Sequence, residues 1–273
     1  MIFFFHFFQI LGKIIPIKFL PFFGAILGKI SFIILKSKRN LIYENLKLSF
    51  PNWEEEKIKR CTLENFKHYG LTFFELFKIK NLIERVEIEG LENLDQKPCI
   101  FITAHLGNWE LLAQVLAKNN VPLYAIAKET YISNFNRFLI NLRKKGKIET
   151  ILRGSKESAK LMLKCIKEKK VLGFLIDQDT KVESVFVPFF GRLASTPSGP
   201  AELAIKKSLP ICFGYIVRKK NLKYSIKIKK LEFQSNDVGK ITSKMTKEIE
   251  IAIRKNPTQW VWVHKRWKTR PSN

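Results

Sequence analysis

Apolar and polar residues alternate along the chain in a way that predicts short strands separated by helices from about residue 86 onward. Continuous β-branched and aromatic runs are typical of buried strands, whereas apolar residues three and four positions apart are typical of helices. The expected strands are residues 99–104, 122–127, 171–176, 211–217 and 224–228, and the expected helices are 109–118, 132–145, 156–168 and 240–254. This alternation predicts an α/β sheet with crossover helices, in which ligands bind at the carboxyl ends of strands.

Upstream of residue 86 the pattern is helical. Apolar residues from Ile58 to Phe77 mark one face of a long helix, with Asn52 as its expected N-cap and Glu55 reaching back. Residues 2–35 are rich in Phe, Ile and Leu, but lysines and prolines interrupt them, so no uncharged stretch reaches the roughly 18 residues of a plain transmembrane helix. A cleavage site of the kind that follows a signal peptide is also missing from this stretch.

This N-terminal stretch divides the chain into two regions. We expect residues 1–36 to form one or two membrane-associating helices that lie in or dip into a bilayer, with their lysines reaching the headgroups. The alternative is that these helices only pack on the domain. Residues 37–273 contain nothing that resembles a linker and are expected to form one catalytic domain. The basic cluster of residues 36–39 suits the cytoplasmic surface of a membrane.

The charge of the chain restricts its partners without choosing among them. With 49 basic and 24 acidic residues, the formal net charge is +25, which favours polyanions such as nucleic acid, anionic lipid headgroups or acidic carrier proteins. A lysine-rich solvated surface is the alternative explanation. The four cysteines are scattered and the four histidines lack metal-ligand spacing, so we expect buried thiols, a reducing compartment and no metal.

Candidate chemistry lies at the end of the first expected core strand. His105 follows that strand, Leu106-Gly107-Asn108 forms the turn, and Asn108 is a good N-cap for the helix that carries Glu110. In this geometry Glu110 can fix the imidazole tautomer, which leaves the other ring nitrogen to take a proton from a hydroxyl. Asp177 follows a second strand end, so we expect it to converge on the same edge of the sheet.

Four segments together resemble a known family. They are the His-x4-Glu box His105–Glu110, the Asp177-Gln178-Asp179 segment, residues 185–191 (VFVPFFG) and the aromatic and basic tail of residues 259–271. In this order and spacing they resemble the bacterial lipid A biosynthesis acyltransferases, the late lauroyl and myristoyl transferases. The resemblance covers nearly the whole chain.

The resemblance implies a function and a set of site residues. It implies transfer of a fatty acyl chain from an acyl carrier protein thioester to a hydroxyl of a Kdo-bearing lipid A precursor, on a glycerolipid acyltransferase-like fold. His105 would be the general base and Glu110 its orienting partner; by position, Arg143 and Asp177 would also be catalytic, and Arg143 could bind a phosphate or stabilise the thioester oxyanion. The residues expected to bind substrate are Asn108, Lys128, Gln178 and Asp179.

The same resemblance implies the partners and the location. They are acyl carrier protein, an anionic glycolipid acceptor and the membrane surface, with no nucleic acid, no cofactor and no metal, at the cytoplasmic face of the inner membrane. Relatives often carry arginine where this chain has Lys128, and lysine keeps the charge but loses the bidentate fork.

Three alternatives remain open at this point. The acceptor could be another glycolipid. Asp177-Gln178-Asp179 also has the form of an Asp-x-Asp metal site of a glycosyltransferase, and manganese dependence would favour that class. A non-enzymatic protein that binds membranes or nucleic acid would explain the charge and the basic, aromatic tail, but it would leave the His105 turn without a purpose.

Overall fold

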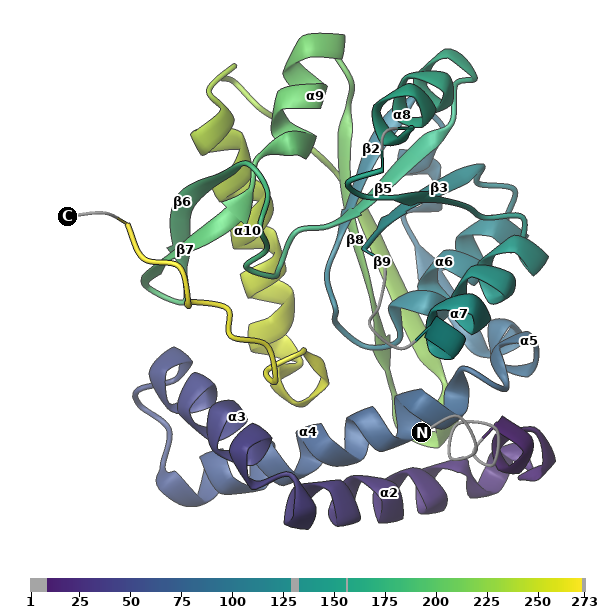
Figure 1. The fold of residues 1–273 in the computed structure, drawn as a ribbon, viewed down its shortest axis with the longest axis vertical. Coiled ribbons are helices and arrows are strands. Elements are labelled where there is room, and N and C mark those ends of the chain that lie inside the picture. Colours follow the sequence, from purple (N-terminus) through teal and green to yellow (C-terminus); the bar gives the residue numbers. More distant parts are fainter. Residues whose placement is uncertain (1–8, 129–132, 156, 272–273) are drawn as a thin grey trace.

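A mixed seven-stranded sheet forms the centre of the molecule (Figure 1). The computed structural model describes residues 9–128, 133–155 and 157–271. The strand order is β1-β9-β8-β2-β5-β3-β4; neighbouring strands are parallel except for the antiparallel pair β8 and β9. The strands of this sheet are β1 Val86–Glu89, β2 Cys99–Thr103, β3 Leu123–Ala127, β4 Glu149–Leu152, β5 Val171–Leu175, β8 Ile211–Arg218 and β9 Tyr224–Leu231.

Helices cover both faces of this sheet. Side chains of α6 and α7 pack on one face, together with Phe101 of β2, while side chains of α9 and α10 pack on the other face with Ile100 and Ile102. Phe101 lies on the opposite face from Ile100 and Ile102 because successive side chains of a strand point to opposite faces of the sheet. The helices are α2 Leu20–Ile34, α3 Lys36–Ser49, α4 Glu55–Glu75, α5 Ile79–Leu82, α6 Trp109–Lys118, α7 Ser133–Lys145, α8 Ser158–Lys167, α9 Gly199–Lys207 and α10 Val238–Lys255.

The predicted α/β architecture is confirmed, because the structure has a mixed sheet flanked by helices. The expected strands and helices from residue 99 onward are all present, with small differences at their ends. The N-cap prediction for α4 was wrong: the helix begins at Glu55, and Glu54 stands at the cap position without a side-chain cap bond. A two-stranded hairpin, β6 Ser184–Phe189 with β7 Arg192–Pro197, was not predicted.

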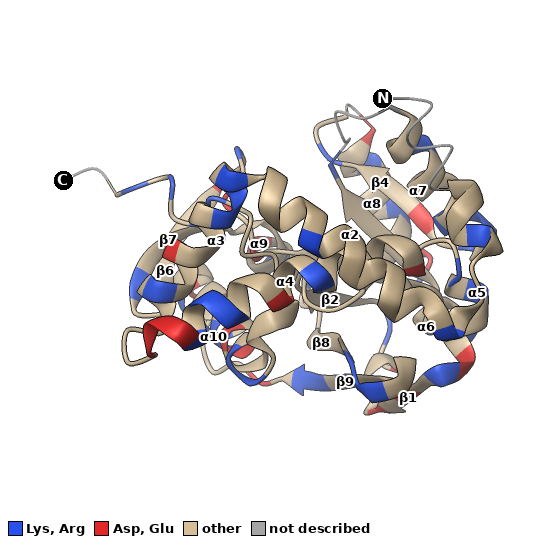
Figure 2. Ribbon diagram, turned by 90° about the horizontal axis from the view of Figure 1, so that it is seen from below, with Lys and Arg blue, Asp and Glu red and all other residues tan. Residues whose placement is uncertain are grey.

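The N-terminal helix α2 lies alongside α4 below the sheet (Figures 1 and 2). Close approach at three glycines makes this contact tight: a Cβ atom on Gly70 would lie 2.2 Å from the Gly24 carbonyl oxygen, and one on Gly28 would lie 2.4 Å from the Lys67 Cα. Residues Ile17–Ile34 form a helical stretch that is long and apolar enough to cross a membrane, although only 17% of it is buried in the protein. One face of α2 is therefore packed on the domain and the other is exposed.

Candidate active site

A cavity of about 1110 Å³ opens beside the carboxyl ends of β2, β5 and β3. Its wall has two parts of different character. The apolar part lies between the sheet and helices α6 and α7 and is lined by Phe101, Leu112, Ala113, Leu116, Leu123, Ala125, Phe135, Leu139 and Gly173. The polar part is lined by Lys128, Arg153, Gln178, Asp179, Thr180, Lys181, Glu183, Glu202, Lys206, His264 and Lys268. We call these the apolar arm and the cationic arm.

His105 and Asp177 meet at this cavity from the ends of two neighbouring strands. The His105 ring nitrogen Nδ1 lies 2.8 Å from Asp177 Oδ1, and the His105 backbone N–H donates to Asp177 Oδ2 at 2.8 Å. The parallel pairing of β2 and β5 brings the two residues together, as expected from the strand ends. His105 lines the cavity, whereas the Asp177 side chain has no exposed surface and lies behind the ring.

The surroundings of Asp177 keep its carboxylate charged. Burial disfavours the charged form, but the attraction of His105 and hydrogen bonds from His105 and Trp260 outweigh burial and lower the pKa of Asp177. The Trp260 indole nitrogen donates to Oδ2 at 2.7 Å. Trp109 also packs edge-on against the His105 ring, with 4.9 Å between ring centroids. The imidazole is therefore fixed on two sides, and a proton on Nδ1 leaves Nε2 as the basic nitrogen.

Glu110 has a different partner from the one expected. Arg143 Nε donates to Glu110 Oε2 at 2.9 Å, and Arg143 Nη2 donates to Oε1, so the two side chains form a bidentate pair between α6 and α7. The expectation that Glu110 orients the His105 ring is corrected, since Asp177 holds Nδ1. Burial alone would lower the pKa of Arg143, but the charge of Glu110 outweighs it and raises the pKa. Both residues line the cavity.

Asn108 is buried beneath the turn and is absent from the residues that line the cavity. The predicted N-cap is confirmed, because Asn108 Oδ1 accepts from the Leu111 backbone N–H at 3.0 Å. Its Nδ2 donates to Glu75 at 2.9 Å. The structure thus gives Asn108 a role in holding the turn, and its contact with substrate stays a prediction. Gly107 has a φ of 66°, and a Cβ atom there would lie 2.1 Å from the Ile216 carbonyl oxygen, so this turn requires glycine.

Asp179 holds the C-terminal segment, although it also lies at the cavity wall. Its carboxylate accepts from the Thr269 backbone N–H at 2.8 Å and from the Thr269 hydroxyl at 3.0 Å. With Asp177 bonded to His105 and Trp260, both carboxylates of the Asp-x-Asp segment are engaged by the protein itself. This geometry favours a holding role for the pair over the binding of a metal-nucleotide complex.

The remaining predicted positions, Lys128 and Gln178, line the cationic arm. Several of their neighbours in the cavity were not predicted from the sequence: Arg153, Lys181, Lys206, His264 and Lys268. Arg153 Nη1 donates to the Thr180 hydroxyl at 3.2 Å, and burial lowers the pKa of Arg153. Two of the missed residues lie within the tail of residues 259–271, whose aromatic and basic pattern was visible in the sequence, but nothing in it shows which of them reach the cavity.

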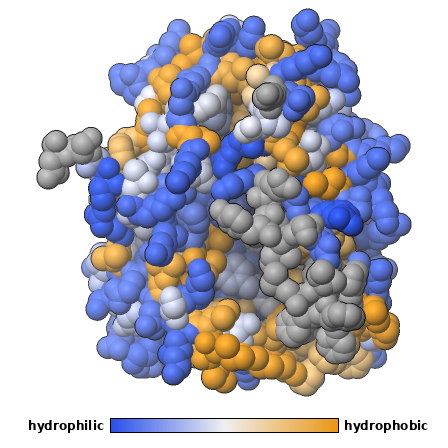
Figure 3. Space-filling view, viewed as in Figure 1, coloured by the Kyte–Doolittle hydropathy of each residue, from blue (hydrophilic) through white to orange (hydrophobic). Residues whose placement is uncertain are grey.

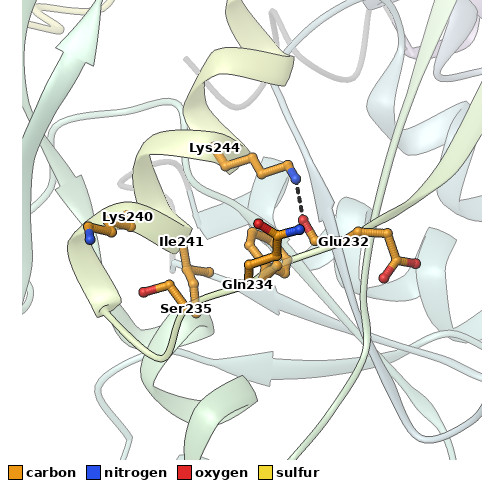
Figure 4. Close-up of a pocket in the computed structure, with 7 residues that line it drawn as sticks. Glu232, Gln234, Ser235, Lys240, Ile241 and Lys244 are labelled. Carbon is orange, nitrogen blue, oxygen red and sulfur yellow. Dashed lines mark hydrogen bonds between the residues drawn. The ribbon is translucent and has the colours of Figure 1, made fainter.

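A second, smaller hollow lies between β9 and the start of α10 (Figure 4). Lys244 donates a hydrogen bond to the Glu232 backbone oxygen in this hollow, while the Lys240 side chain points away from the hollow. The hollow is lined by neither histidine nor cysteine, and none of its lining residues belongs to the larger cavity. Of these two hollows, the larger one therefore holds the histidine–carboxylate pair.

A histidine base held by a buried carboxylate, beside an apolar arm and a cationic arm, is an arrangement that can activate a hydroxyl next to an amphipathic substrate. Comparison with known proteins makes this specific. The sequence model of the family described as bacterial lipid A biosynthesis acyltransferase matches residues 1–269. The chain therefore belongs to this family, and the predicted resemblance is confirmed.

Individual relatives agree with the family match. The chain is 25% identical over 273 residues to a lipid A biosynthesis palmitoleoyltransferase of Escherichia coli, covering 94% of this chain and 87% of the relative. It is 24% identical over 267 residues to the lauroyltransferase of the same organism, covering 91% and 85%. A phosphatidylinositol mannoside acyltransferase of Mycolicibacterium smegmatis is 20% identical over 218 residues, which cover 76% of this chain and 71% of the relative.

Proposed function

We propose that the protein transfers a fatty acyl chain from an acyl carrier protein thioester to a hydroxyl of a Kdo-bearing lipid A precursor, with His105 as the general base. The observation that carries the proposal is the His105–Asp177 pair at the junction of the apolar arm and the cationic arm. The pair supplies a base for a hydroxyl, and the two arms suit an acyl chain and an anionic headgroup. Membership of the lipid A acyltransferase family supports the same assignment.

In the proposed reaction, His105 Nε2 takes the proton of the acceptor hydroxyl while the hydroxyl oxygen attacks the thioester carbonyl carbon. Asp177 stabilises the imidazolium that forms. The carbon–sulfur bond then breaks, and the thiolate of the carrier takes the proton from the imidazolium. Because Glu110 anchors Arg143 at the cavity wall, the guanidinium is placed to stabilise the negative charge on the carbonyl oxygen during the attack.

The apolar arm supports the assignment of an acyl substrate. Phe101, Gly173 and Ala125 stand in register on adjacent parallel strands and form its floor. From Ala127 at the strand end to Leu123, the arm extends about 13 Å at the usual rise of about 3.3 Å per residue. The small side chains at positions 125 and 173 leave room along this path for an alkyl chain.

Substitution of the floor should change the preferred donor. We expect Gly173→Leu to fill the apolar arm and shift the preference towards acyl chains shorter than those the wild type uses. Gly173→Ala should give a smaller shift, because an added Cβ would lie 3.1 Å from Leu123 Cδ1 and needs only a slight adjustment. Competition assays with a series of acyl carrier thioesters measure this preference. An unchanged order of donors in a folded Gly173→Leu variant would contradict the assignment.

The cationic arm and the net charge support anionic partners. Lys128, Arg153 and Lys268 line this arm, and the chain carries a formal net charge of +25. Phosphate groups of a lipid A precursor and the acidic surface of an acyl carrier protein are both complementary to this charge. The match to phosphatidylinositol mannoside acyltransferases keeps another glycolipid as the second candidate acceptor.

We also propose that the protein acts at the cytoplasmic face of the inner membrane, with α2 lying in the plane of the lipid headgroups. Exposed apolar side chains follow the outer face of α2, and Figure 3 shows hydrophobic residues gathered along the lower edge where Figure 1 places this helix. Lys36, Lys38 and Arg39 follow at the start of α3 and suit anionic lipid. Gly28 packs against the backbone of Lys67, whose ammonium group pairs with Glu64, so a spanning α2 would draw these charges into hydrocarbon.

Charges on the outer face of α2 should therefore release the protein from membranes. Phe22 and Ile33 are 62% and 65% exposed, and we expect the double variant Phe22→Glu/Ile33→Glu to bind vesicles at least about 100-fold more weakly, since each buried apolar side chain contributes about 1.5–3 kcal/mol. Flotation with vesicles that contain anionic phospholipid measures this. The matched control is Leu163→Glu/Leu193→Glu, which charges two exposed apolar residues outside α2. Equal loss of flotation in both double variants would contradict the proposal.

The biological acceptor can be tested in cells. Lipid A from a strain that lacks this protein should contain a species that is missing one acyl chain, visible by mass spectrometry. Expression of the wild-type protein should restore the chain, and expression of His105→Ala should not. Unaltered lipid A in the deletion strain would contradict the lipid A precursor as acceptor and favour the second candidate.

A further inference from the structure

We propose that Glu75 and Arg218, which lie outside the cavity, are positioning residues that hold the turn of residues 105–108 in its reactive geometry. The inference rests on the proposed function, because it concerns how the His105 base is placed. Glu75 is the last residue of α4 and Arg218 is the last residue of β8. Neither residue carries a pattern in the sequence that points to a site, and neither lines the cavity.

Glu75 gathers hydrogen bonds from three other residues in the interior. Its side chain has no exposed surface. Arg218 donates to it through Nε at 2.5 Å and through Nη2 at 2.9 Å, and Tyr224 donates through its hydroxyl at 2.6 Å. The fourth donor is Asn108 Nδ2 at 2.9 Å, and the other end of the Asn108 amide caps α6. Glu75 thus holds the Asn108 side chain, and Asn108 in turn caps the start of α6, the helix that carries Glu110.

Arg218 fixes the same turn by a second route. Its backbone N–H donates to Gln259 Oε1 at 2.9 Å, and its carbonyl oxygen accepts from Gln259 Nε2 at 2.9 Å. The Gln259 backbone oxygen accepts from the Gly107 N–H at 3.0 Å. The next residue, Trp260, forms a β-bridge with Leu106 and donates to Asp177.

Every residue of the turn is consequently held. His105 is bonded to Asp177, Leu106 is bridged to Trp260, Gly107 is bonded to Gln259, and Asn108 is bonded to Glu75. At Asn108 the anchor is the Glu75 side chain, and at Gly107 the anchor runs through Gln259 to the backbone of Arg218, whose side chain Glu75 holds. A reacting nitrogen on such a turn has little freedom to move away from the substrate hydroxyl.

The charge of this pair is hard to explain by stability alone. Removing two charges from water is costly, and well-packed apolar residues of similar volume are often as stabilising as a buried ion pair. The Arg218 guanidinium also has partners besides Glu75: Nη1 lies 2.8 Å from His68 Nδ1, and Nη2 donates to the Thr72 hydroxyl at 2.8 Å. Burial and the nearby Arg218 lower the pKa of His68, which keeps its ring neutral and able to accept this bond. The arrangement specifies geometry at the turn.

Glu75→Gln tests the inference, because it keeps the shape of the side chain and removes its charge. We expect kcat to fall by about 10- to 100-fold, since a displacement of about 1 Å at a reacting group can cost about 100-fold in rate. The KM for the acyl carrier thioester should change by less than about twofold, because neither arm of the cavity is altered. The matched control is Glu250→Gln: Glu250 is a buried glutamate on α10 that pairs with Arg254 and accepts from the Phe190 N–H. It should lower the melting temperature without lowering kcat.

A double-mutant cycle separates positioning from general loss of stability. If Glu75 acts through Asn108, the loss of kcat in Glu75→Gln/Asn108→Ala should be clearly smaller than the product of the two single losses. Tyr224→Phe, which removes one donor to Glu75, provides the same test if Glu75→Gln does not fold, and it should lower kcat without changing KM. Multiplicative losses, or equal kcat values in Glu75→Gln and Glu250→Gln, would overturn the inference. Absence of acyl transfer by the wild type would instead overturn the proposed function.

Discussion

We expect His105→Ala to lower kcat for acyl transfer by about 10² to 10⁴, the usual contribution of a general base. The loss should be this large because a hydroxyl is a weak nucleophile until its proton is removed. Among the described residues, His105 is the only histidine that is hydrogen-bonded to Asp177. Steady-state assays with purified protein, varying the acyl carrier thioester at saturating acceptor, measure the change. The KM for the thioester should stay within a few-fold, because the arms that bind both substrates are intact.

Folding of the His105→Ala variant provides the control. Removal of the ring takes one hydrogen bond from the buried Asp177 carboxylate, so we expect a lower melting temperature but a cooperative unfolding transition that shows a folded variant. A folded variant with near-normal turnover would contradict the general-base mechanism, whatever the identity of the acceptor.

Asp177→Asn should cause a loss of similar order, about 10² to 10⁴ in kcat. The Asp177 carboxylate accepts from the His105 backbone N–H, the His105 ring and the Trp260 indole. An asparagine offers one oxygen, which the backbone N–H and the indole already share, so its NH₂ group turns towards His105 Nδ1. Nδ1 would then be the unprotonated nitrogen and Nε2 would carry the proton, which leaves no base facing the substrate.

The same variant should change the response of stability to acid. Because the pKa of Asp177 is lowered in the folded protein from its ordinary 3.8, its stabilising contribution is complete at neutral pH and is lost as the pH falls through the lowered value. Thermal unfolding of Asp177→Asn should therefore depend less on pH than that of the wild type at the acidic end. Asp179→Asn is the matched control, since Asp179 bonds to Thr269 rather than to His105, and it should cost much less in kcat. Equal losses in kcat for the two variants would contradict the role of Asp177.

Local patterns in the sequence predicted the turn that carries His105. An apolar strand, a glycine and an N-cap asparagine specify a strand–turn–helix within ten residues, and the structure has each of them. The convergence of Asp177 on His105 also follows from a general rule, because parallel strands end at one edge of a sheet. The β6–β7 hairpin was not predicted, because residues 185–190 form a continuous apolar run that contains Pro188 and lacks the apolar–polar alternation of a half-buried strand.

The other partners of the turn could not be predicted, because they come from distant parts of the chain and no rule of strand order places them. Trp260 lies 83 positions after Asp177, and Arg218 lies 143 positions after Glu75. The prediction that Glu110 orients the His105 ring was wrong for the same reason. Its position in the first turn of α6 was predicted, but the competing attraction of Arg143 on α7 depends on how the two helices pack.

Reconstitution of the reaction is the most direct test of acyl transfer by this protein. Purified protein would be incubated with acyl carrier protein loaded with a fatty acyl chain and with a phosphorylated, Kdo-bearing lipid A precursor, and the lipid would be analysed by mass spectrometry. We expect a precursor heavier by one acyl ester, formed in step with release of the free carrier thiol and absent with His105→Ala. Failure of the wild type to form this ester, or release of thiol without it, would contradict the assignment of acyl transfer from the carrier to this acceptor.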